Sequence, residues 1–505
     1  MEGWVRLSER DQVVITLRPY AAGETIQLDN NVVMTVREQV PKGHKIVTSP
    51  VAAGQDVYKF GYSIGKAVKE LQPGDWVHTH NLRTGLGDIL DYRYEPEEQV
   101  GFGQEAQAGS VNYHPNRQFN GYVRANGEVG IRNEVWIINT VGCINKTCEI
   151  LARRADEQFR GRVDGVFHFA HPFGCSQLGD DLAHTQKLLA SLVHHPNAGA
   201  VLVVGLGCEN NGIDSFKKAI GNYDPERVKF LKSQEEEDEL EAGMELLEQL
   251  VDYASAFGRE PVPVSKLKLG LKCGGSDGLS GITANPLVGA VSDRLIDAGG
   301  TAILTEVPEM FGAETILMNR AADEQVFSNI VSLINEFKHY YIRHGQVIYD
   351  NPSPGNKEGG ITTLEEKSLG CTQKGGHATV NDVVKYGDRV AKNGLNLLEA
   401  PGNDLVSVTA LAAAGAHIVL FTTGRGTPFG GPVPTVKIST NTELAVRKKN
   451  WIDYNAGQLL EDKSMTEMTD ELWNDLISLA SGERRTHNER NGFREIAIFK
   501  DGVIL

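Results

Sequence analysis

The chain has 505 residues, and at roughly 100 to 200 residues per domain we expect it to fold into three or four units. It carries 50 Lys and Arg against 66 Asp and Glu, and this formal net charge of −16 argues against nucleic acid or an anionic membrane surface as its partner. With 40% hydrophobic and 23% charged residues, it has the composition of a soluble globular protein rather than of a disordered one.

Targeting signals are not apparent in the sequence. No apolar run approaches the roughly 20 residues that cross a bilayer, and the first residues, MEGWVRLSERDQ, lack the basic and apolar regions of a signal peptide. We therefore expect a cytoplasmic protein without a membrane partner. Six cysteines are too few for a disulfide scaffold, and in a reducing compartment thiols are more often buried, catalytic or bound to metal.

Residues 1–95 are predicted to form a small β-rich domain. Short apolar runs such as VVITL and HKIVTSPV are separated by turn signals rich in Pro and Gly. Near its end lies VHTHN, in which His78 and His80 would face the same side of an extended strand. This spacing places two imidazoles towards one metal ion or one sugar, and the alternative is a solvent-facing pair on an edge strand.

The polar stretch 96–120 shows no apolar periodicity and is predicted to be an interdomain linker. Beyond it, apolar runs alternate with helical stretches, which is typical of a parallel sheet covered by helices. We assign residues 121–374 to an α/β catalytic domain and 375–505 to a C-terminal α/β lobe. The predicted strands are 135–141, 165–171, 200–207, 267–273, 301–307 and 417–424, and 234–254 is predicted to be an amphipathic helix.

Four cysteines follow predicted strands, at the edge where open parallel sheets bind ligands. They are Cys143, Cys175, Cys208 and Cys273, and they are accompanied by His171, Glu209 and Asp277. Each could be a small buried residue beside a strand. Together they favour a metal or iron–sulfur centre, because thiolates and imidazoles suit iron and zinc. We interpret Cys148 as packing and expect Cys371 not to be a ligand.

Two glycine-rich loops are candidate sites for an anionic substrate. The loop 274–281, GGSDGLSG, precedes a predicted helix and offers free backbone amides, with Ser276 and Asp277 within it. The loop TTGRGTP places Arg425 in a tight turn at a strand end, where its guanidinium could hold a carboxylate by two hydrogen bonds. Both could be structural turns. Lys437 could equally be a solvent-exposed lysine on an edge strand or a lysine that binds the substrate.

Common cofactor motifs are weak or absent. Residues 205–210, GLGCEN, begin like a dinucleotide fingerprint after a strand, but Asn210 stands where the last glycine is required. The sequence contains no P-loop ending in Gly-Lys-Ser/Thr. Nucleotide-dependent chemistry is therefore disfavoured.

Longer ordered strings carry a family resemblance that runs nearly end to end. They include GHKIVTSPVAAGQDVYKFGYSIG, VHTHN, FGCSQLGDD, VLVVGLGCEN, CGGSDGLSGITANP, TEVPEMFGAE, NPSPGNKEGGITTLEEKSLGCTQK and TTGRGTPFGG. The chain resembles the altronate/galactarate dehydratase family. This resemblance implies an N-terminal β domain of the SAF type followed by Rossmann-like α/β domains. It also implies removal of water from a sugar acid, with ferrous iron, or sometimes manganese, as cofactor.

Within that resemblance the altronate branch fits best, and its reaction converts D-altronate to 2-dehydro-3-deoxy-D-gluconate. A Lewis-acid metal would stabilise the charge that forms when the C2 proton leaves. Our hypothesis assigns the metal to His171, Cys175, Cys208, Cys273 and Cys143. It assigns acid–base roles to His78, His80 and Glu209, and substrate binding to Ser276, Asp277, Asn356, Lys357, Arg425 and Lys437.

Several alternatives stay open at this point. Relatives of the family act on galactarate or eliminate sulfite from a sulfonated hydroxy acid, and a protein that only binds a sugar acid would retain the same scaffold. The cysteines permit either mononuclear iron or an iron–sulfur cluster. A homo-oligomer is expected.

Overall fold

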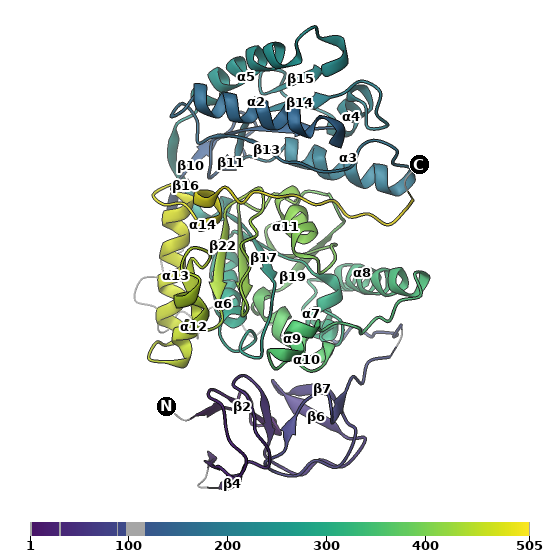
Figure 1. The fold of residues 1–505 in the computed structure, drawn as a ribbon, viewed down its shortest axis with the longest axis vertical. Helices are drawn as coiled ribbons and strands as arrows, with labels where there is room; N and C mark the ends of the chain where they lie inside the picture. Colours follow the sequence, from purple (N-terminus) through teal and green to yellow (C-terminus); the bar gives the residue numbers. More distant parts are fainter. Residues whose placement is uncertain (1–2, 30–31, 88, 97–116, 504–505) are drawn as a thin grey trace.

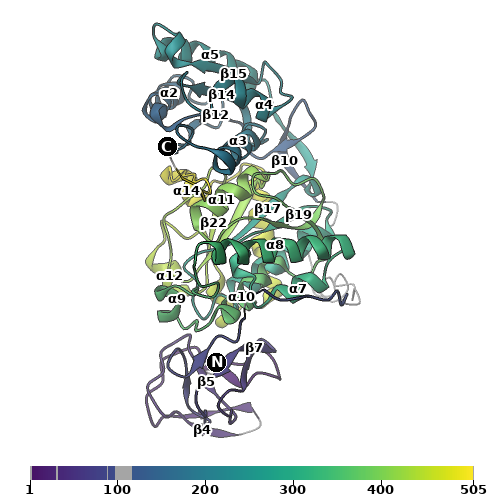
Figure 2. The ribbon, with the colours of Figure 1, turned by 90° about the vertical axis from the view of Figure 1, so that its right-hand side faces the viewer.

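The computed structural model describes residues 3–29, 32–87, 89–96 and 117–503, which form three domains stacked along one axis. The N-terminal domain lies at one end, the domain around β17 lies in the middle, and the domain around β14 lies at the other end (Figure 1). The order in space therefore differs from the order in sequence, because the second domain along the chain lies farthest from the first. A view turned by 90° shows the same stack (Figure 2).

The N-terminal domain consists of short strands, as expected. A four-stranded sheet has the order β1-β2-β5-β8, a three-stranded sheet has the order β6-β7-β9, and β3 pairs with β4. These strands are Trp4–Val5, Val13–Thr16, Lys45–Val47, Trp76–Val77, Asp56–Lys59, Tyr62–Ala67, Leu82–Arg83, Thr25–Gln27 and Val33–Thr35. Both faces of β2 and β5 are buried, so the domain has an apolar core of its own despite its size.

The second domain contains a four-stranded parallel sheet of order β13-β12-β14-β15. Its strands are Glu134–Asn139 (β12), Val166–His168 (β13), Ala198–Gly205 (β14) and Val228–Lys232 (β15). Its helices are Asn145–Gln158 (α2), Gly179–Val193 (α3), Ile213–Ile220 (α4) and Glu239–Ser255 (α5). A small antiparallel sheet of Val129–Gly130 (β11), Gln118–Val123 (β10) and Arg259–Pro263 (β16) connects this domain to the next.

The third domain is built on a seven-stranded parallel sheet of order β19-β20-β18-β17-β21-β22-β23. Its strands are Lys268–Cys273 (β17), Thr301–Leu304 (β18), Val380–Val384 (β19), Gly394–Leu398 (β20), Ile418–Thr423 (β21), Thr435–Ser439 (β22) and Tyr454–Asn455 (β23). Its helices are Ala284–Asp297 (α6), Glu314–Asn319 (α7), Glu324–Arg343 (α8), Pro354–Glu358 (α9), Leu364–Thr372 (α10), Asp404–Ala413 (α11), Thr442–Arg447 (α12), Met465–Ala480 (α13) and His487–Asn491 (α14).

The domain limits differ from those expected from the sequence. The sheet takes β17 and β18 from before residue 374 and its other five strands from after it, so 375–505 is not a separate lobe. The change of domain lies instead near Val264, where β16 ends. Residues 92–94, which the sequence placed in the N-terminal domain, contact the third domain. Of the expected linker 96–120, residues 97–116 lie outside the described residues, and β10 begins at Gln118.

All six strands expected from apolar runs are present. Five of the runs are buried on both faces of a parallel sheet, and the edge strand β13 is partly buried. One face of the seven-stranded sheet packs on α6, α8 and α13. The other packs on α11, and the same apolar cluster continues through α3 into the second domain. The second and third domains therefore share a core and form one body.

The end of the chain ties these two domains together. Residues after α14 run between them (Figure 1), and the Arg494 guanidinium pairs with the Glu134 carboxylate of β12 at 2.8 Å. Arg132 pairs with Glu489 at 2.7 Å. All four side chains are at most 5% exposed, so these are buried ion pairs across the domain boundary.

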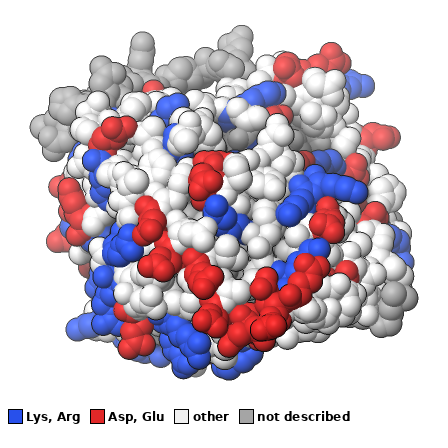
Figure 3. Space-filling view, turned by 90° about the horizontal axis from the view of Figure 1, so that it is seen from above, with Lys and Arg blue, Asp and Glu red and all other residues white. Residues whose placement is uncertain are grey.

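The outer surface carries mixed charge. On the end face formed by the second domain, acidic and basic side chains are interspersed and a band of acidic side chains runs along one side (Figure 3). Among the described residues, no helix is both long enough and apolar enough to cross a membrane.

Candidate functional site

The N-terminal domain docks on loops at the carboxyl edge of the seven-stranded sheet, and buried ion pairs hold it there. The Glu366 carboxylate of α10 accepts hydrogen bonds from Lys45 Nζ at 2.8 Å and from Lys59 Nζ at 2.9 Å. Lys45 also donates to the Gly360 carbonyl at 2.7 Å. Burial alone would raise the pKa of Glu366, but the two ammonium groups overcome it and hold this pKa at about 2.

Glycines allow the two backbones to meet. A Cβ atom at Gly278, in the loop 274–281, would lie 2.0 Å from the Gly43 carbonyl oxygen of the N-terminal domain. A Cβ at Gly360, whose φ is +103°, would lie 2.4 Å from the same oxygen. Only glycine fits at these two positions, so the glycine-rich loop serves as the surface on which the first domain rests.

A small cavity lies at this junction. It is lined from the N-terminal domain by Lys59 and Phe60 and from the third domain by Ser276, Asn285, Lys367 and Cys371, among others. Asp277 and Glu366 also line this cavity, so its two lysines are matched by two acidic residues, and its volume of about 10 Å³ is room for one water molecule.

His78 also lies in the interface. Its Nδ1 is 3.0 Å from Thr362 Oγ1, and its ring stacks on Trp76 with centroids 5.3 Å apart. Burial and the nearby Lys45 ammonium lower the pKa of His78 to about 4, so this imidazole is neutral at pH 7. His80 behaves differently: its side chain is 38% exposed and lies 3.9 Å from Glu38 within its own domain. The two histidines therefore do not converge on one ligand.

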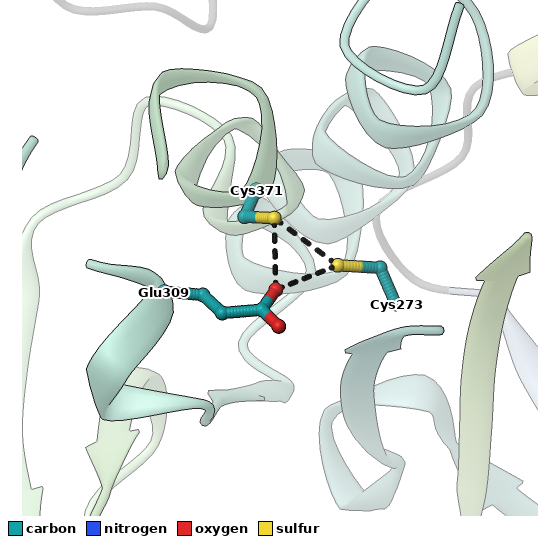
Figure 4. A group of neighbouring side chains, drawn as sticks. All are labelled: Cys273, Glu309 and Cys371. Carbon is teal, nitrogen blue, oxygen red and sulfur yellow. Dashed lines mark hydrogen bonds between the residues drawn. The ribbon is translucent and has the colours of Figure 1, made fainter. Parts of the chain in front are cut away.

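Below the cavity, two thiols and a carboxylate meet (Figure 4). Cys273 Sγ at the end of β17 is 3.2 Å from Cys371 Sγ of α10, and the Cys371 thiol donates to Glu309 Oε2 at 3.1 Å. Among the described residues, these three form the one group of potential metal ligands whose donor atoms lie within 4.8 Å of one another.

Lysines already neutralise this group. Lys374 Nζ donates to Cys273 Sγ at 2.9 Å, and Lys367 Nζ donates to Glu309 Oε1 at 2.8 Å. Lys272 pairs with Glu306 beside them. Burial raises the pKa of Glu309 by itself, but the three lysines lower it overall, so the carboxylate is ionised. The lysines supply the positive charge that a metal ion would bring.

Comparisons with known proteins cover the whole chain. Residues 2–85 match "Altronate/galactarate dehydratase SAF domain", 121–255 match "D-galactarate dehydratase/Altronate hydrolase, second domain", and 264–504 match "D-galactarate/Altronate dehydratase, C-terminal". The chain is 52% identical to altronate dehydratase from Escherichia coli (strain K12) over 99% of its length and 100% of the relative's. The chain belongs to the altronate/galactarate dehydratase family.

Two further relatives show the range of this family. Altronate dehydratase from Bacillus subtilis (strain 168) is 50% identical, with both chains fully covered. Galactarate dehydratase (L-threo-forming) from Escherichia coli (strain K12) is 30% identical over 92% of this chain and 91% of its own. The matched ranges agree with the three domains seen in the structure, and the first domain is of the SAF type.

The substrate-binding residues expected from the sequence lie mostly near the interface between the SAF domain and the third domain, where most of them hold loops in place. Asn356 Nδ2 donates to the Ser276 carbonyl at 2.8 Å, which joins α9 to the glycine-rich loop. Asp277 is half-buried and accepts from Thr440 Oγ1 at 2.9 Å. Arg425 is 46% exposed and pairs with Glu358 at 2.9 Å, at the rim of the interface. Lys357, in α9, is half-buried.

Lys437 is not an edge-strand lysine in solvent, because it is 1% exposed on β22. Its Nζ donates to the carbonyl oxygens of Thr427 and Phe429, the former at 3.1 Å. Burial lowers its pKa to about 8. Lys437 therefore holds the loop that carries Arg425.

Two residues of the hypothesis have structural roles in the second domain. The His171 ring Nε2 lies 2.9 Å from the Asn139 carbonyl, and its Nδ1 accepts from the Phe173 amide at 3.2 Å, so neither nitrogen offers a lone pair to a metal. Glu209 accepts from Thr140 Oγ1 at 2.6 Å and from the Gly207 amide at 2.7 Å. It fixes the loop after β14, far in the fold from the SAF interface.

The five proposed metal ligands do not form one site. Cys143, Cys175 and Cys208 are exposed on adjacent loops of the second domain, whereas Cys273 is buried in the third. Cys371, which we expected not to be a ligand, lies 3.2 Å from Cys273 in the group that lysines already neutralise. The error arose because two separate parallel sheets were treated as one sheet with a single carboxyl edge.

The sequence analysis missed the charged residues of the interface. They are Lys45, Lys59, Glu309, Glu366 and Lys367, which lie in strings that resemble the family but carry no motif of their own. The available signal was the helix LEEKSLGCT, whose charges look like a solvent-facing surface. The burial of these charged side chains becomes apparent only in the folded protein, where another domain supplies their ion-pair partners.

Proposed function

We propose that this chain dehydrates D-altronate to 2-dehydro-3-deoxy-D-gluconate and water. The observation that carries the proposal is the end-to-end similarity to altronate dehydratases, at 50 to 52% identity. The expected cytoplasmic location and homo-oligomer stay predictions from the sequence.

The chemistry makes two demands on the site. The C2 proton next to an ionised carboxylate is weakly acidic, and the C3 hydroxide is a poor leaving group. Lys59 and Lys367 lie beside the cavity, but they already pair with Glu366 at 2.9 Å and with Glu309 at 2.8 Å, so we assign neither demand to them. The enol that forms by loss of hydroxide then tautomerises to the 2-keto acid.

His78 is the proposed base for the C2 proton. Its pKa of about 4 leaves the imidazole neutral, so one ring nitrogen has a free lone pair. The contact of its Nδ1 with Thr362 Oγ1 orients the ring at the interface. Closure of the SAF domain would bring this base to the substrate and exclude water from the carbanion-like intermediate.

Ferrous iron is the cofactor that we propose for the family reaction, and when bound it would act as a Lewis acid towards the substrate oxygens. Thiol donors favour iron over manganese, which prefers oxygen ligands. The group of Cys273, Cys371 and Glu309 does not suit a divalent ion as it stands. Lys374 and Lys367 occupy the thiol and carboxylate at 2.9 and 2.8 Å, and no step is assigned to a metal there.

The test is a keto-acid assay of the purified protein with altronate, galactarate and a sulfonated hydroxy acid. Turnover on altronate above the others supports the proposal, and preferential turnover on galactarate or release of sulfite would replace it with one of those activities. Absence of turnover on all three, with binding of a sugar acid retained, would show a binding protein instead.

A matched pair of variants tests the base. His78→Asn is expected to lower kcat by about 10²- to 10⁴-fold, the usual contribution of a positioned base. His80→Asn removes an exposed imidazole two residues away and should leave kcat unchanged. Equal effects in both variants would remove His78 from the mechanism.

A further inference from the structure

The second domain carries three exposed thiols at one edge of its sheet. Cys143 follows β12, Cys175 follows β13 and Cys208 follows β14, and these three strands are neighbours in the order β13-β12-β14. The carboxyl ends of parallel strands meet at one edge, so the three loops are adjacent. Free cysteines are usually buried, as Cys148, Cys273 and Cys371 are here, so packing does not account for the exposed three.

The loops that bear these thiols are locked to one another. The Gly142 amide donates to the Phe173 carbonyl at 2.8 Å, which joins the first loop to the second. The Ser176 amide donates to Asn210 Oδ1 at 2.8 Å, and the Asn211 amide donates to the Gly174 carbonyl at 2.9 Å, which join the second to the third. Each bonded residue is within three positions of a cysteine, so the three thiols are held by one rigid rim.

Close backbone contact at this rim leaves no room for side chains. A Cβ at Gly174, whose φ is +100°, would lie 1.9 Å from the Thr140 carbonyl oxygen. A Cβ at Gly142 would lie 2.7 Å from the His171 carbonyl oxygen. Glycine next to the cysteines therefore brings the loops as close together as their backbones permit.

Buried polar atoms near the rim have no partner within the described part of the chain. They are Asn139 Oδ1, His168 Nε2, Gln177 Nε2 and Asn211 Oδ1. All four residues lie at the ends of β12 and β13 or in the loops that carry Cys175 and Cys208. A buried polar atom left unpaired is costly, and a group of them at one place indicates that water or a bound group completes the site.

The spacing of the thiols indicates a cluster rather than one ion. Two thiolates on a tetrahedral ion, each about 2.3 Å from it, lie roughly 3.8 Å apart. The three sulfurs do not belong to any group of donors within 4.8 Å among the described residues. A cluster of several irons holds its cysteines farther apart. Gln234 Nε2 donates to Cys208 Sγ at 3.6 Å, and hydrogen bonds to sulfur tune iron–sulfur centres.

We propose that Cys143, Cys175 and Cys208 bind an iron–sulfur cluster of the four-iron class, with one iron that has no cysteine ligand. Each thiol loses its proton when it binds iron, and the cluster assembles from equal amounts of ferrous and ferric iron with sulfide, so no further oxidant is needed. The iron without a cysteine ligand would be open to a small oxygen ligand. This inference extends the iron requirement in the proposed function by naming where iron is bound, and it does not depend on which sugar acid reacts.

The test measures iron and acid-labile sulfide in the full-length protein, purified without oxygen and reconstituted with equal amounts of ferrous and ferric iron and with sulfide. We expect about four of each per chain, the composition of a four-iron cluster, together with broad visible absorption that is bleached by air. Cys143→Ser, Cys175→Ser and Cys208→Ser should each lose most of the iron and sulfide. Cys148→Ala, at a buried cysteine of α2, should keep both.

Circular dichroism of the metal-free proteins shows whether each variant folds, so lost iron is not mistaken for lost structure. Iron bound without sulfide, or a cluster that survives the triple serine variant, would overturn the proposal. Loss of the cluster in Cys273→Ser with Cys371→Ser, and not in the rim variants, would also overturn it. Because iron and sulfide are measured without substrate, failure of the altronate assay leaves this result intact.

Discussion

At the scale of single residues, buried ion pairs between domains determine how the domains of this protein dock. Lys45 and Lys59 reach from the SAF domain to one carboxylate, Glu366, and all three side chains are at most 2% exposed. A buried ion pair of this kind adds little to the free energy of unfolding compared with an apolar contact, but removal of one partner leaves the other charge buried without a counter-charge. The pairing therefore specifies where the SAF domain docks.

Glu366→Gln tests this docking. We expect it to lower the free energy of unfolding by about 3 to 5 kcal/mol at pH 7, because two ammonium groups are left without a counter-charge. Glu149→Gln is the control, since Glu149 is 59% exposed in its pair with Lys146 and should change stability by under about 1 kcal/mol. Urea unfolding measures both.

The same variant predicts a pH dependence. The pKa of Glu366 is about 2 in the folded protein and 4.5 ordinarily, so its stabilisation is complete above pH 4.5 and is lost as pH falls from 4.5 through 2. The stability difference between wild type and Glu366→Gln should therefore shrink over that range. A constant difference from pH 6 to pH 3 would contradict the assigned pairing.

At the scale of elements, α10 joins the SAF domain to the thiol group. All nine of its residues are buried, Glu366 facing Lys45 and Lys59 while Lys367 and Cys371 face Glu309. The sequence could not predict this, because its charges have partners only in the folded protein. By contrast, the run 200–207 predicted β14 (198–205) well, since burial on both faces leaves a continuous apolar string. The strands β19 (VNDVV) and β20 (GLNLL) were missed because asparagine or aspartate interrupts their short apolar runs.

Gly278→Ala tests the loop on which the SAF domain rests. The new Cβ would lie 2.0 Å from Gly43 O, so we expect the domain to be displaced and the backbone amides of residues 41–44 and 356–362 to lose protection against hydrogen exchange. Gly258→Ala, where a Cβ meets nothing within 4 Å, should leave the exchange pattern as it is. Unchanged protection in Gly278→Ala would contradict the observed approach of the two backbones.

At the scale of the whole molecule, the second and third domains behave as one body because they share an apolar core and two buried ion pairs. Glu134→Gln leaves the Arg494 guanidinium buried without its carboxylate, so we expect a loss of about 3 to 5 kcal/mol and a separate calorimetric transition for the second domain. Asp252→Asn, in the exposed pair with Arg162, should preserve a single transition. A single transition in Glu134→Gln as well would show that the apolar core alone couples the domains.

The anchoring of the chain after the SAF domain limits how far that domain can travel. Tyr92 Oη donates to Glu314 and Tyr94 Oη to the Ala321 carbonyl, so the chain is fastened to the third domain soon after Gly85. The six residues 86–91 reach at most about 20 Å when extended. An undocked SAF domain therefore stays within this distance of its docking surface, so its effective concentration at that surface is high. It docks again on the third domain of its own chain instead of on that of a neighbouring molecule.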